Sequence, residues 1–426
     1  MKAAFYTLGC KVNQYDTQMM SEKFVSAGHT VVGFDEQADV YIINTCTVTQ
    51  ISDKKSRNMI SRVMRAHPGA VIAVCGCFSQ VSPEQAAAIP GVCIVLGTRN
   101  RADILYYVNE YLKTGRQIVD VQSSSDIADE KISGFSEKTR AILKIEDGCR
   151  NFCSYCLIPF ARGKILSKPP EQVVAEATAV AEAGYKEIVL TGIHLSSYGV
   201  DLEGVTLADV IESVANVEGV RRIRLGSLEP TVITPAFVDR ISKVDVLCPS
   251  FHLSLQSGCD KTLKAMNRRY SARQYAHAVG LLREYFKDCA VTTDVIVGFP
   301  GETDEDFKQS CDFIDEIGFA RIHIFPYSKR SGTKAAQMEN QISKSVKQQR
   351  ERVLCEIERK NRMEFMSRFV NKTVYVLTER CETGVCSGFT ENYIHVEFAG
   401  KADLCNTVAA VKVLRVSDGG LLGEVN

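Results

Sequence analysis

The sequence predicts an α/β protein of several domains, in which two regions alternate strands with helices and a third region is all β. Short apolar runs followed by glycine-rich or polar loops and helical stretches recur over residues 1 to about 115, and again from residue 141. This alternation favours parallel sheets. From Phe369 onward the chain is rich in β-branched residues with glycine turns instead. At 426 residues the chain is long enough for two to four domains.

The first region predicts an open parallel sheet with three cysteines at its ligand-binding edge. The expected strands are Ala3–Leu8, Val40–Asn44 and Ala70–Val74. Each of them is soon followed by a cysteine. These cysteines are Cys10, Cys46 and Cys77.

Ligands of open parallel sheets bind beyond the carboxyl ends of the strands, so the three thiols could converge on one point. From the residues alone, core packing is the default interpretation for all three. Cys75 and Cys93 lie inside apolar runs, the latter being Val92–Leu96, and we interpret both as small buried hydrophobes.

The second region begins after a polar stretch, Val121 to Thr139, that indicates an interdomain linker. Six strand–helix units follow. Their expected strands are Ala141–Ile145, Glu187–Thr191, Arg221–Leu225, Phe251–Leu255, Val291–Val297 and Arg321–Phe325. The helical segments between the strands lie near 171–183, 206–216, 234–242, 272–286 and 304–317.

Three cysteines after the first of these strands carry the strongest chemical signal in the chain. Cys149, Cys153 and Cys156 have the spacing Cys-x3-Cys-x2-Cys, with no fourth cysteine close behind. A protein-held iron–sulfur cluster ordinarily takes four thiolates, so three on one loop would leave one iron open to a small molecule. The alternatives are a zinc knuckle or three buried thiols, and zinc would need a distant fourth ligand.

The loop from Glu146-Asp147-Gly148-Cys149 to Cys156, Pro159 and Gly163 resembles that of the radical S-adenosylmethionine (SAM) enzymes, and among them the methylthiotransferases. The resemblance implies a partial (βα)6 barrel for the second region. It also implies two 4Fe–4S clusters, one held by Cys149, Cys153 and Cys156 and an auxiliary one held by Cys10, Cys46 and Cys77.

The family scheme consumes two SAM molecules per turnover. One methylates a sulfide at the auxiliary cluster, and the other is cleaved to a radical that removes hydrogen from an unactivated carbon. Residues at the barrel strand ends are the expected SAM contacts. They are Tyr155, Gly192, Ser227, Glu229, Gln256, Arg268, Asp294 and Tyr327. We interpret His194, His252 and His323 as hydrogen-bonded barrel histidines rather than bases.

The third region resembles a TRAM domain, a small five-stranded barrel associated with RNA binding. Its motif is Gly388-Phe-Thr-Glu-Asn392-Tyr-Ile-His-Val. Before it, residues 340 to 369 predict a charged helix with a broken apolar stripe (Ile342, Val346, Val353, Leu354 and Ile357) and many basic residues, including Arg350. This helix either packs on the barrel as a solvated element or contacts an RNA backbone.

Several segments resemble the methylthiotransferase subgroup that acts on N6-threonylcarbamoyladenosine in tRNA. They include Gly9-Cys10-Lys11-Val12-Asn13-Gln14 and His323-Ile-Phe-Pro326-Tyr-Ser-Lys329-Arg330. Lys329 and Arg330 could bind the carboxylate of that substrate by charge-assisted hydrogen bonds. One alternative is methylthiolation of N6-isopentenyladenosine, which would want an apolar pocket. Another is a non-catalytic, metal-stabilised RNA-binding protein.

Together these observations divide the chain into an N-terminal methylthiotransferase domain (1–118), a linker (119–138), a radical SAM core (139–366) and a TRAM domain (367–426). Lys+Arg and Asp+Glu both number 51, so a tRNA anticodon stem-loop must be held by a local basic face. No apolar run reaches membrane-spanning length. Sixteen cysteines without an export signal imply reduced thiols and a cytoplasmic protein. The sequence does not identify the electron donor or the sulfur source.

Overall fold

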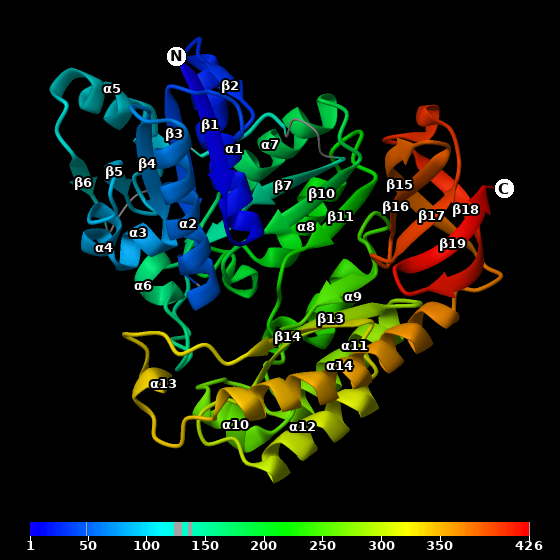
Figure 1. Ribbon diagram of the computed structural model, residues 1–426. Helices are drawn as coiled ribbons and strands as arrows, with labels where there is room; N and C mark the ends of the chain where they lie inside the picture. Colours follow the sequence, from blue (N-terminus) through cyan, green and yellow to red (C-terminus); the bar gives the residue numbers. More distant parts are fainter. Residues whose placement is uncertain (48, 123–129, 135–138, 426) are drawn as a thin grey trace.

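The computed structural model describes residues 1–47, 49–122, 130–134 and 139–425. Three bodies follow one another along the chain: an N-terminal α/β domain, a central half-barrel, and a small C-terminal barrel beside it (Figure 1). The predicted fold class is confirmed. The division into domains at 118, 138 and 366 stays our proposal, and much of the predicted linker lies outside the described residues.

The N-terminal domain is built on a six-stranded parallel sheet with helices on both faces. The two central strands are buried along their whole length, as expected for strands covered on both faces. In order across the sheet, the strands are β2 (Thr30–Val32), β1 (Lys2–Thr7), β3 (Val40–Thr45), β4 (Val71–Gly76), β5 (Val92–Leu96) and β6 (Ile118–Asp120). The helices are α1 (Lys11–Ser26), α2 (Gln50–Ala66), α3 (Cys77–Val81), α4 (Pro83–Ala87) and α5 (Ile104–Thr114).

The central domain has six parallel strands in chain order, grouped as two three-stranded sheets. Two isolated parallel bridges, Ile223 with Leu247 and Leu228 with Leu253, link the two halves. This is the predicted partial (βα)6 barrel. Its strands are β7 (Arg140–Lys144), β10 (Glu187–Thr191), β11 (Arg222–Leu225), β12 (Ser250–His252), β13 (Ala290–Val297) and β14 (Arg321–Pro326).

The barrel helices begin where the sequence offers caps. Thr303 and Asp306 form a capping box at the start of α12 (Asp304–Ile317), and Gly318 ends that helix in a left-handed conformation. Ser271 and Gln274 form the capping box at the start of α11 (Ala272–Tyr285). The others are α7 (Pro170–Glu182), α8 (Leu207–Ala215), α9 (Pro235–Ile241), and the short α6 (Ile158–Arg162), α10 (Asp260–Ala265) and α13 (Lys334–Gln337).

The C-terminal domain is a closed barrel of five strands, as expected from the resemblance to a TRAM domain. In order around the barrel, the strands are β15 (Thr373–Glu382), β16 (Val385–Thr390), β17 (His395–Ala399), β19 (Gly420–Val425) and β18 (Val408–Ser417). Cys381 and Cys386 lie opposite each other in the β15–β16 register and form a disulfide, with Cα atoms 4.0 Å apart. The expectation that all thiols are reduced is therefore wrong for this pair.

The predicted charged helix is α14 (Lys344–Ser367), which packs against β14 and α12. The predicted apolar stripe is only partly correct, because Val353 is exposed while Arg350 and Asn361 are buried. Arg350 does not face solvent: its guanidinium lies 2.6 Å from the Glu302 carboxylate beneath the helix. Arg350, paired with Glu302, therefore faces inward, whereas Val353, which hydrophobicity alone would place inside, is exposed.

A buried group of charges joins the N-terminal domain to the central barrel. Asp16 of α1 lies 2.6 Å from Arg101 and 2.9 Å from Lys144 of β7. Arg162 lies 3.0 Å from Asp147 and 3.2 Å from Asp16. All five side chains are at most 1 % exposed. Their opposite charges compensate one another where water cannot, which fixes the two domains in one relative position.

Part of the stretch predicted to be a polar linker contributes to this junction. Glu130 is buried and pairs with Arg101 at 3.6 Å, and Ile132 joins the hydrophobic core. Composition alone did not indicate this packing, since the glutamate is held by cations distant in sequence. Separately, no helix in the described parts of the chain is long and apolar enough to cross a bilayer.

We expect Asp16→Asn to lower the free energy of unfolding by about 3–5 kcal/mol, because it leaves buried cations without their counter-charge. The measurement is the shift of the denaturation midpoint in guanidinium chloride. Asp239→Asn is the control, since Asp239 and Lys243 form an exposed pair at 2.7 Å and such pairs contribute about 0–1 kcal/mol. Equal shifts for the two variants would contradict the role given to the junction.

Candidate active site

The Cys149–Cys156 loop leaves the barrel just after β7 and is closed by glycine. Gly148 has φ +112°, and a Cβ atom there would lie 2.0 Å from the Lys164 carbonyl oxygen, so no other residue fits. The backbone N–H of Cys149 donates to the Gly163 carbonyl at 3.2 Å. These contacts fold the loop back on itself and bring its three cysteines together.

The sulfur atoms of this loop receive N–H donors. Arg268 donates to Cys153 Sγ at 3.3 Å, and the backbone N–H of Ile158 donates to Cys156 Sγ at 3.4 Å. Burial, with the neighbouring thiols adding to it, raises the pKa of Cys156 to about 12 and that of Cys149 to about 11. These thiols ionise with difficulty on their own, but hydrogen-bond donors are in place for their thiolates. Such a set is suited to binding the irons of a cluster.

Glu229 stands beside this loop in a polar arrangement of its own. Its carboxylate accepts from Asn151 Nδ2 at 2.9 Å and lies 2.9 Å from Arg268 and 3.2 Å from His194. Burial opposes ionisation, but the hydrogen bond from His194 and the charge of Arg268 hold the pKa of Glu229 below its ordinary value. Glu229 and Arg268, two predicted SAM contacts, thus form a buried ion pair next to Cys153.

The three N-terminal cysteines lie at adjacent strand ends of one sheet edge. Cys10 precedes α1, Cys46 follows β3, and Cys77 begins α3 after β4. Gly9 brings the first two loops into contact: its φ is +108°, and a Cβ atom there would lie 2.9 Å from Cys46 Cβ. Asn13 also ties the loops together, since its side-chain N–H groups donate to the carbonyls of Leu8 at 2.7 Å and Thr45 at 3.0 Å.

Arg162 connects the two sets of cysteines. It ends α6, directly after the barrel loop, and its guanidinium donates to the Asn13 side chain. Burial raises the pKa of Cys10, and the positive charge of Arg162 acts in the opposite sense. The same guanidinium interacts with Cys77. A cation among three thiols is the expected companion of anionic sulfur ligands.

A cavity of about 1120 Å³ opens between the three bodies. Cys10 and Lys11 of the N-terminal domain line it, together with Gly192 and Ser227 at barrel strand ends and Asp294 in the middle of β13. Phe389, Asn392, Tyr393 and His395 of the C-terminal barrel line it as well, together with Glu351, Cys355, Glu358 and Arg362 of α14. The cavity therefore joins a cysteine of the first set to the mouth of the barrel.

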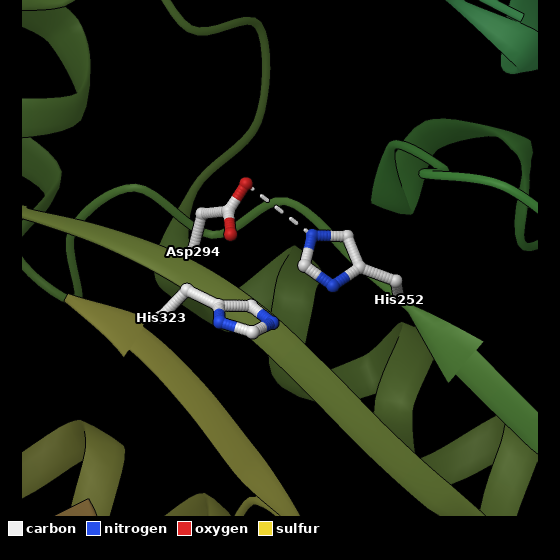
Figure 2. A group of neighbouring side chains, drawn as sticks. All are labelled: His252, Asp294 and His323. Carbon is white, nitrogen blue, oxygen red and sulfur yellow. Dashed lines mark ion pairs between the residues drawn. The ribbon is translucent and has the colours of Figure 1, made fainter. Parts of the chain in front are cut away.

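His252, Asp294 and His323 gather on three neighbouring strands in the wall of this cavity (Figure 2). The carboxylate of Asp294 lies 3.4 Å from His252 Nε2, and one ligand atom from each of the three residues lies within 4.8 Å of the others. His252 also bonds Thr292 Oγ1 at 3.0 Å. Two histidines and a carboxylate could hold a divalent transition ion. Burial lowers the pKa of His323, and the nearby His252, Arg321 and Lys11 lower it further.

The other predicted contacts are more dispersed. Tyr155, Phe299 and Tyr327 pack together with Met266 behind the cysteine loop, in a small apolar cluster. Gln256 sits in a left-handed conformation (φ 70°) and its backbone N–H donates to the Asp294 carbonyl at 2.8 Å. These side chains are thus close to the cysteine loop or to the cavity wall, and their contacts with SAM stay predictions.

Arg330 and Lys329 do not line the cavity. Arg330 is buried against the N-terminal domain, with its guanidinium 2.6 Å from the Asp53 carboxylate and 2.6 Å from Thr47 Oγ1. It thus has a protein partner beside Cys46. A substrate-binding role for Lys329 and Arg330 stays a prediction.

Sequence reasoning missed several residues of the site. Asn13, Arg162 and Arg321 were not singled out, and Lys11 was only part of a resembling motif. The available signal was position: Lys11 and Asn13 follow Cys10 by one and three residues, so the first turn of a helix brings both back to the thiol. Arg162 carried no such signal, because it reaches the first cysteine set from a different domain.

Comparison with protein families places this geometry in context. Residues 143–314 match the radical SAM superfamily, and residues 2–97 match the uncharacterized protein family UPF0004. A solved structure of the radical SAM methyltransferase TsrM from Kitasatospora setae, with cobalamin and a [4Fe-4S] cluster bound, superposes with a TM-score of 0.58 at 13 % identity. The superposition covers 91 % of this chain and 80 % of TsrM, and it supports the fold alone.

The fold and the cysteine loop define a radical SAM enzyme, a class that works with a 4Fe–4S cluster and SAM. Threonylcarbamoyladenosine tRNA methylthiotransferase MtaB of Bacillus subtilis is 41 % identical over 97 % of this chain and 93 % of its own length. The Thermotoga maritima MtaB is 38 % identical over 98 % and 95 %, respectively. The tRNA-2-methylthio-N(6)-dimethylallyladenosine synthase of Clostridium tetani is 33 % identical over 99 % and 96 %. The chain belongs to the tRNA methylthiotransferase family.

We expect Gly9→Ala to destabilise the protein more than Gly28→Ala. Both glycines have positive φ, so each alanine costs about 1–2 kcal/mol of backbone strain. Only at Gly9 does the new methyl group meet a neighbour, Cys46; nothing lies within 4 Å at Gly28. Overpacking of this kind adds about 1–3 kcal/mol, measured as the difference between the two denaturation midpoints. Equal midpoints would mean that the two cysteine loops are not in contact.

Proposed function

We propose that this enzyme transfers a methylthio group to C2 of N6-threonylcarbamoyladenosine at position 37 of tRNA, next to the anticodon. The observation that carries the proposal is a cavity that brings Cys10 of the N-terminal domain together with Gly192 and Ser227, at the carboxyl ends of two barrel strands. Radical formation and sulfur transfer must act on the same carbon atom, so the two cysteine sets need a common space. The similarity to the two MtaB proteins over nearly the whole chain supports this substrate.

Two 4Fe–4S clusters would be bound, one by Cys149, Cys153 and Cys156 and one by Cys10, Cys46 and Cys77. When bound, they supply an electron for SAM cleavage and a site for the sulfur, with two SAM molecules used per turnover. The protein's part is to hold and shield the reactants. Glu229 and Arg268 offer a charge pair for the amino and carboxyl groups of SAM, and Arg162 compensates the negative charge of the auxiliary thiolates.

The tRNA anticodon stem-loop would enter over the C-terminal barrel. Phe389 and Tyr393 stack on each other with ring centroids 4.8 Å apart and line the cavity, where an unstacked base could extend the stack. We assign the TRAM domain and α14 to this contact and the cytoplasm as the place of reaction, since the substrate is tRNA.

Nucleoside mass analysis of tRNA from a strain lacking the gene tests the substrate. We expect 2-methylthio-N6-threonylcarbamoyladenosine to disappear and its unmethylthiolated precursor to accumulate, with recovery when the gene is restored. A gene copy carrying Cys153→Ala is the matched control and should not restore the product. Accumulation of unmethylthiolated isopentenyladenosine instead would assign the enzyme to the alternative substrate.

Iron and sulfide quantitation on anaerobically purified protein tests the number of clusters. We expect about eight irons in the wild-type protein and about four after Cys10, Cys46 and Cys77 are all changed to alanine, because each 4Fe–4S cluster carries four irons. The same change at Cys93, Cys355 and Cys405, which belong to neither set, should leave the iron content unchanged. A triple variant that keeps about eight irons would refute the auxiliary site.

A further inference from the structure

Lys11 lies at the edge of a compact group of charges between the barrel and the C-terminal domain. At its centre is Glu187 of β10, whose carboxylate is 2.8 Å from Arg140 Nε and 2.8 Å from Arg224 Nε. A third arginine, Arg222, is 3.9 Å away. Lys11 interacts electrostatically with Arg140, Arg224 and Glu187. Three arginines thus share one buried carboxylate, with Lys11 close by.

The arginines find further partners, but Lys11 does not. Arg140 also pairs with Glu379, and Arg222 lies 3.9 Å from Glu391. Arg224 donates to the backbone carbonyl of Glu391 at 2.7 Å. Among the residues that the structure describes, none places a carboxylate within ion-pair distance of the Lys11 ammonium group. The group lacks one anion.

Lys11 is exposed and lines the cavity, directly after Cys10 in the chain. Arg321 lines the same cavity and, among the described residues, forms no ion pair with a carboxylate. Both side chains lie near His323, which is also in the cavity lining. The two other cations of the lining are already engaged: Arg224 with Glu187, and Arg362 with Glu358 at 3.3 Å. This side of the cavity therefore has two cations free to meet an anionic ligand.

We propose that Lys11, assisted by Arg321, binds the carboxylate on the N6 substituent of the target adenosine and so selects a charged substituent over an uncharged one. The inference rests on the proposed function. N6 and C2 project from the same edge of the adenine ring, on either side of N1. When C2 faces the sulfur-carrying centre at Cys10, the substituent on N6 must lie nearby, within reach of Lys11.

An uncharged isopentenyl group at that position would cover the ammonium group without offering it a partner. Sites built around a polar group reject analogues that lack its partner far more strongly than apolar pockets reject small changes of shape. Lys329 and Arg330 are less suited to the role, because neither lines the cavity and Arg330 is already paired with Asp53.

The test is a binding cycle between Lys11 and the carboxylate. Fluorescence anisotropy measures the Kd of full-length, cluster-loaded enzyme for two anticodon stem-loop RNAs, one with N6-threonylcarbamoyladenosine and one with the neutral threoninamide analogue. We expect Lys11→Met to weaken binding of the charged RNA by about tenfold to a hundredfold, the size of one charge-assisted hydrogen bond. It should leave the Kd for the amide RNA within about twofold of wild type, since no carboxylate is then lost.

Lys11→Arg keeps the charge and should retain most of the preference for the charged RNA, whereas Lys329→Met should leave that preference unchanged. Iron content and visible absorbance of each variant check that the neighbouring cysteine site is intact. The ratio of the two Kd values for wild-type protein gives a result even if a variant misfolds. Equal losses for both RNAs, or a loss of preference in Lys329→Met alone, would overturn the inference. If wild-type enzyme binds threonylcarbamoyl and isopentenyl RNAs alike and modifies the latter, the proposed function itself fails.

Discussion

The arrangement of the whole molecule depends on the buried ion pairs between α1 and the first strand and loop of the barrel. Asp16 meets Arg101, Lys144 and Arg162 in a region with almost no solvent. Charges buried this deeply are stable only when their partners are in place, so a small rotation of one domain against the other would leave several of them unpaired. Hydrophobic contact alone would permit sliding, whereas this group permits essentially one orientation.

Helix α1 connects this domain junction to the site. Cys10, just before the helix, and Lys11, its first residue, line the cavity. Asn13 in the first turn donates to the Cys46 loop, and Asp16 in the second turn pairs with the barrel cations. Arg162 then links this helix to the loop that bears Cys149, Cys153 and Cys156. Two sets of cysteines from different domains are therefore held in a fixed relation to each other by the same short stretch of helix. Reactions that pass a radical and a sulfur atom to one carbon need this fixed separation.

Much of the fold could be predicted from local pattern. The apolar runs at Val40–Asn44 and Val291–Val297 form strands within one residue or so of the expected bounds, and the five predicted barrel helices are all present. Strand β16, Val385–Thr390, has no apolar alternation that would predict it, because its buried positions are Cys386, Gly388 and Thr390. The stripe on α14 was partly wrong because an ion pair, Arg350 with Glu302, replaced an apolar contact. Local hydrophobicity does not encode which buried charges will meet.

The same distinction separates the parts of the site that a sequence reveals from those it hides. Cysteine spacing identifies ligands because three thiolates on one loop have few other uses, and strand-end positions narrow the choice for Cys10, Cys46 and Cys77. Recognition of a charged substituent has no such local pattern. Lys11 and Lys329 are the same residue type, and what tells them apart is that Lys11 lines the cavity whereas Lys329 does not. The buried carboxylate of Glu187 is already paired with Arg140, Arg222 and Arg224, so the free charge of Lys11 is a property of the assembled domains. A cation that can bind a substrate carboxylate is thus one, like Lys11, for which the folded protein supplies no carboxylate of its own.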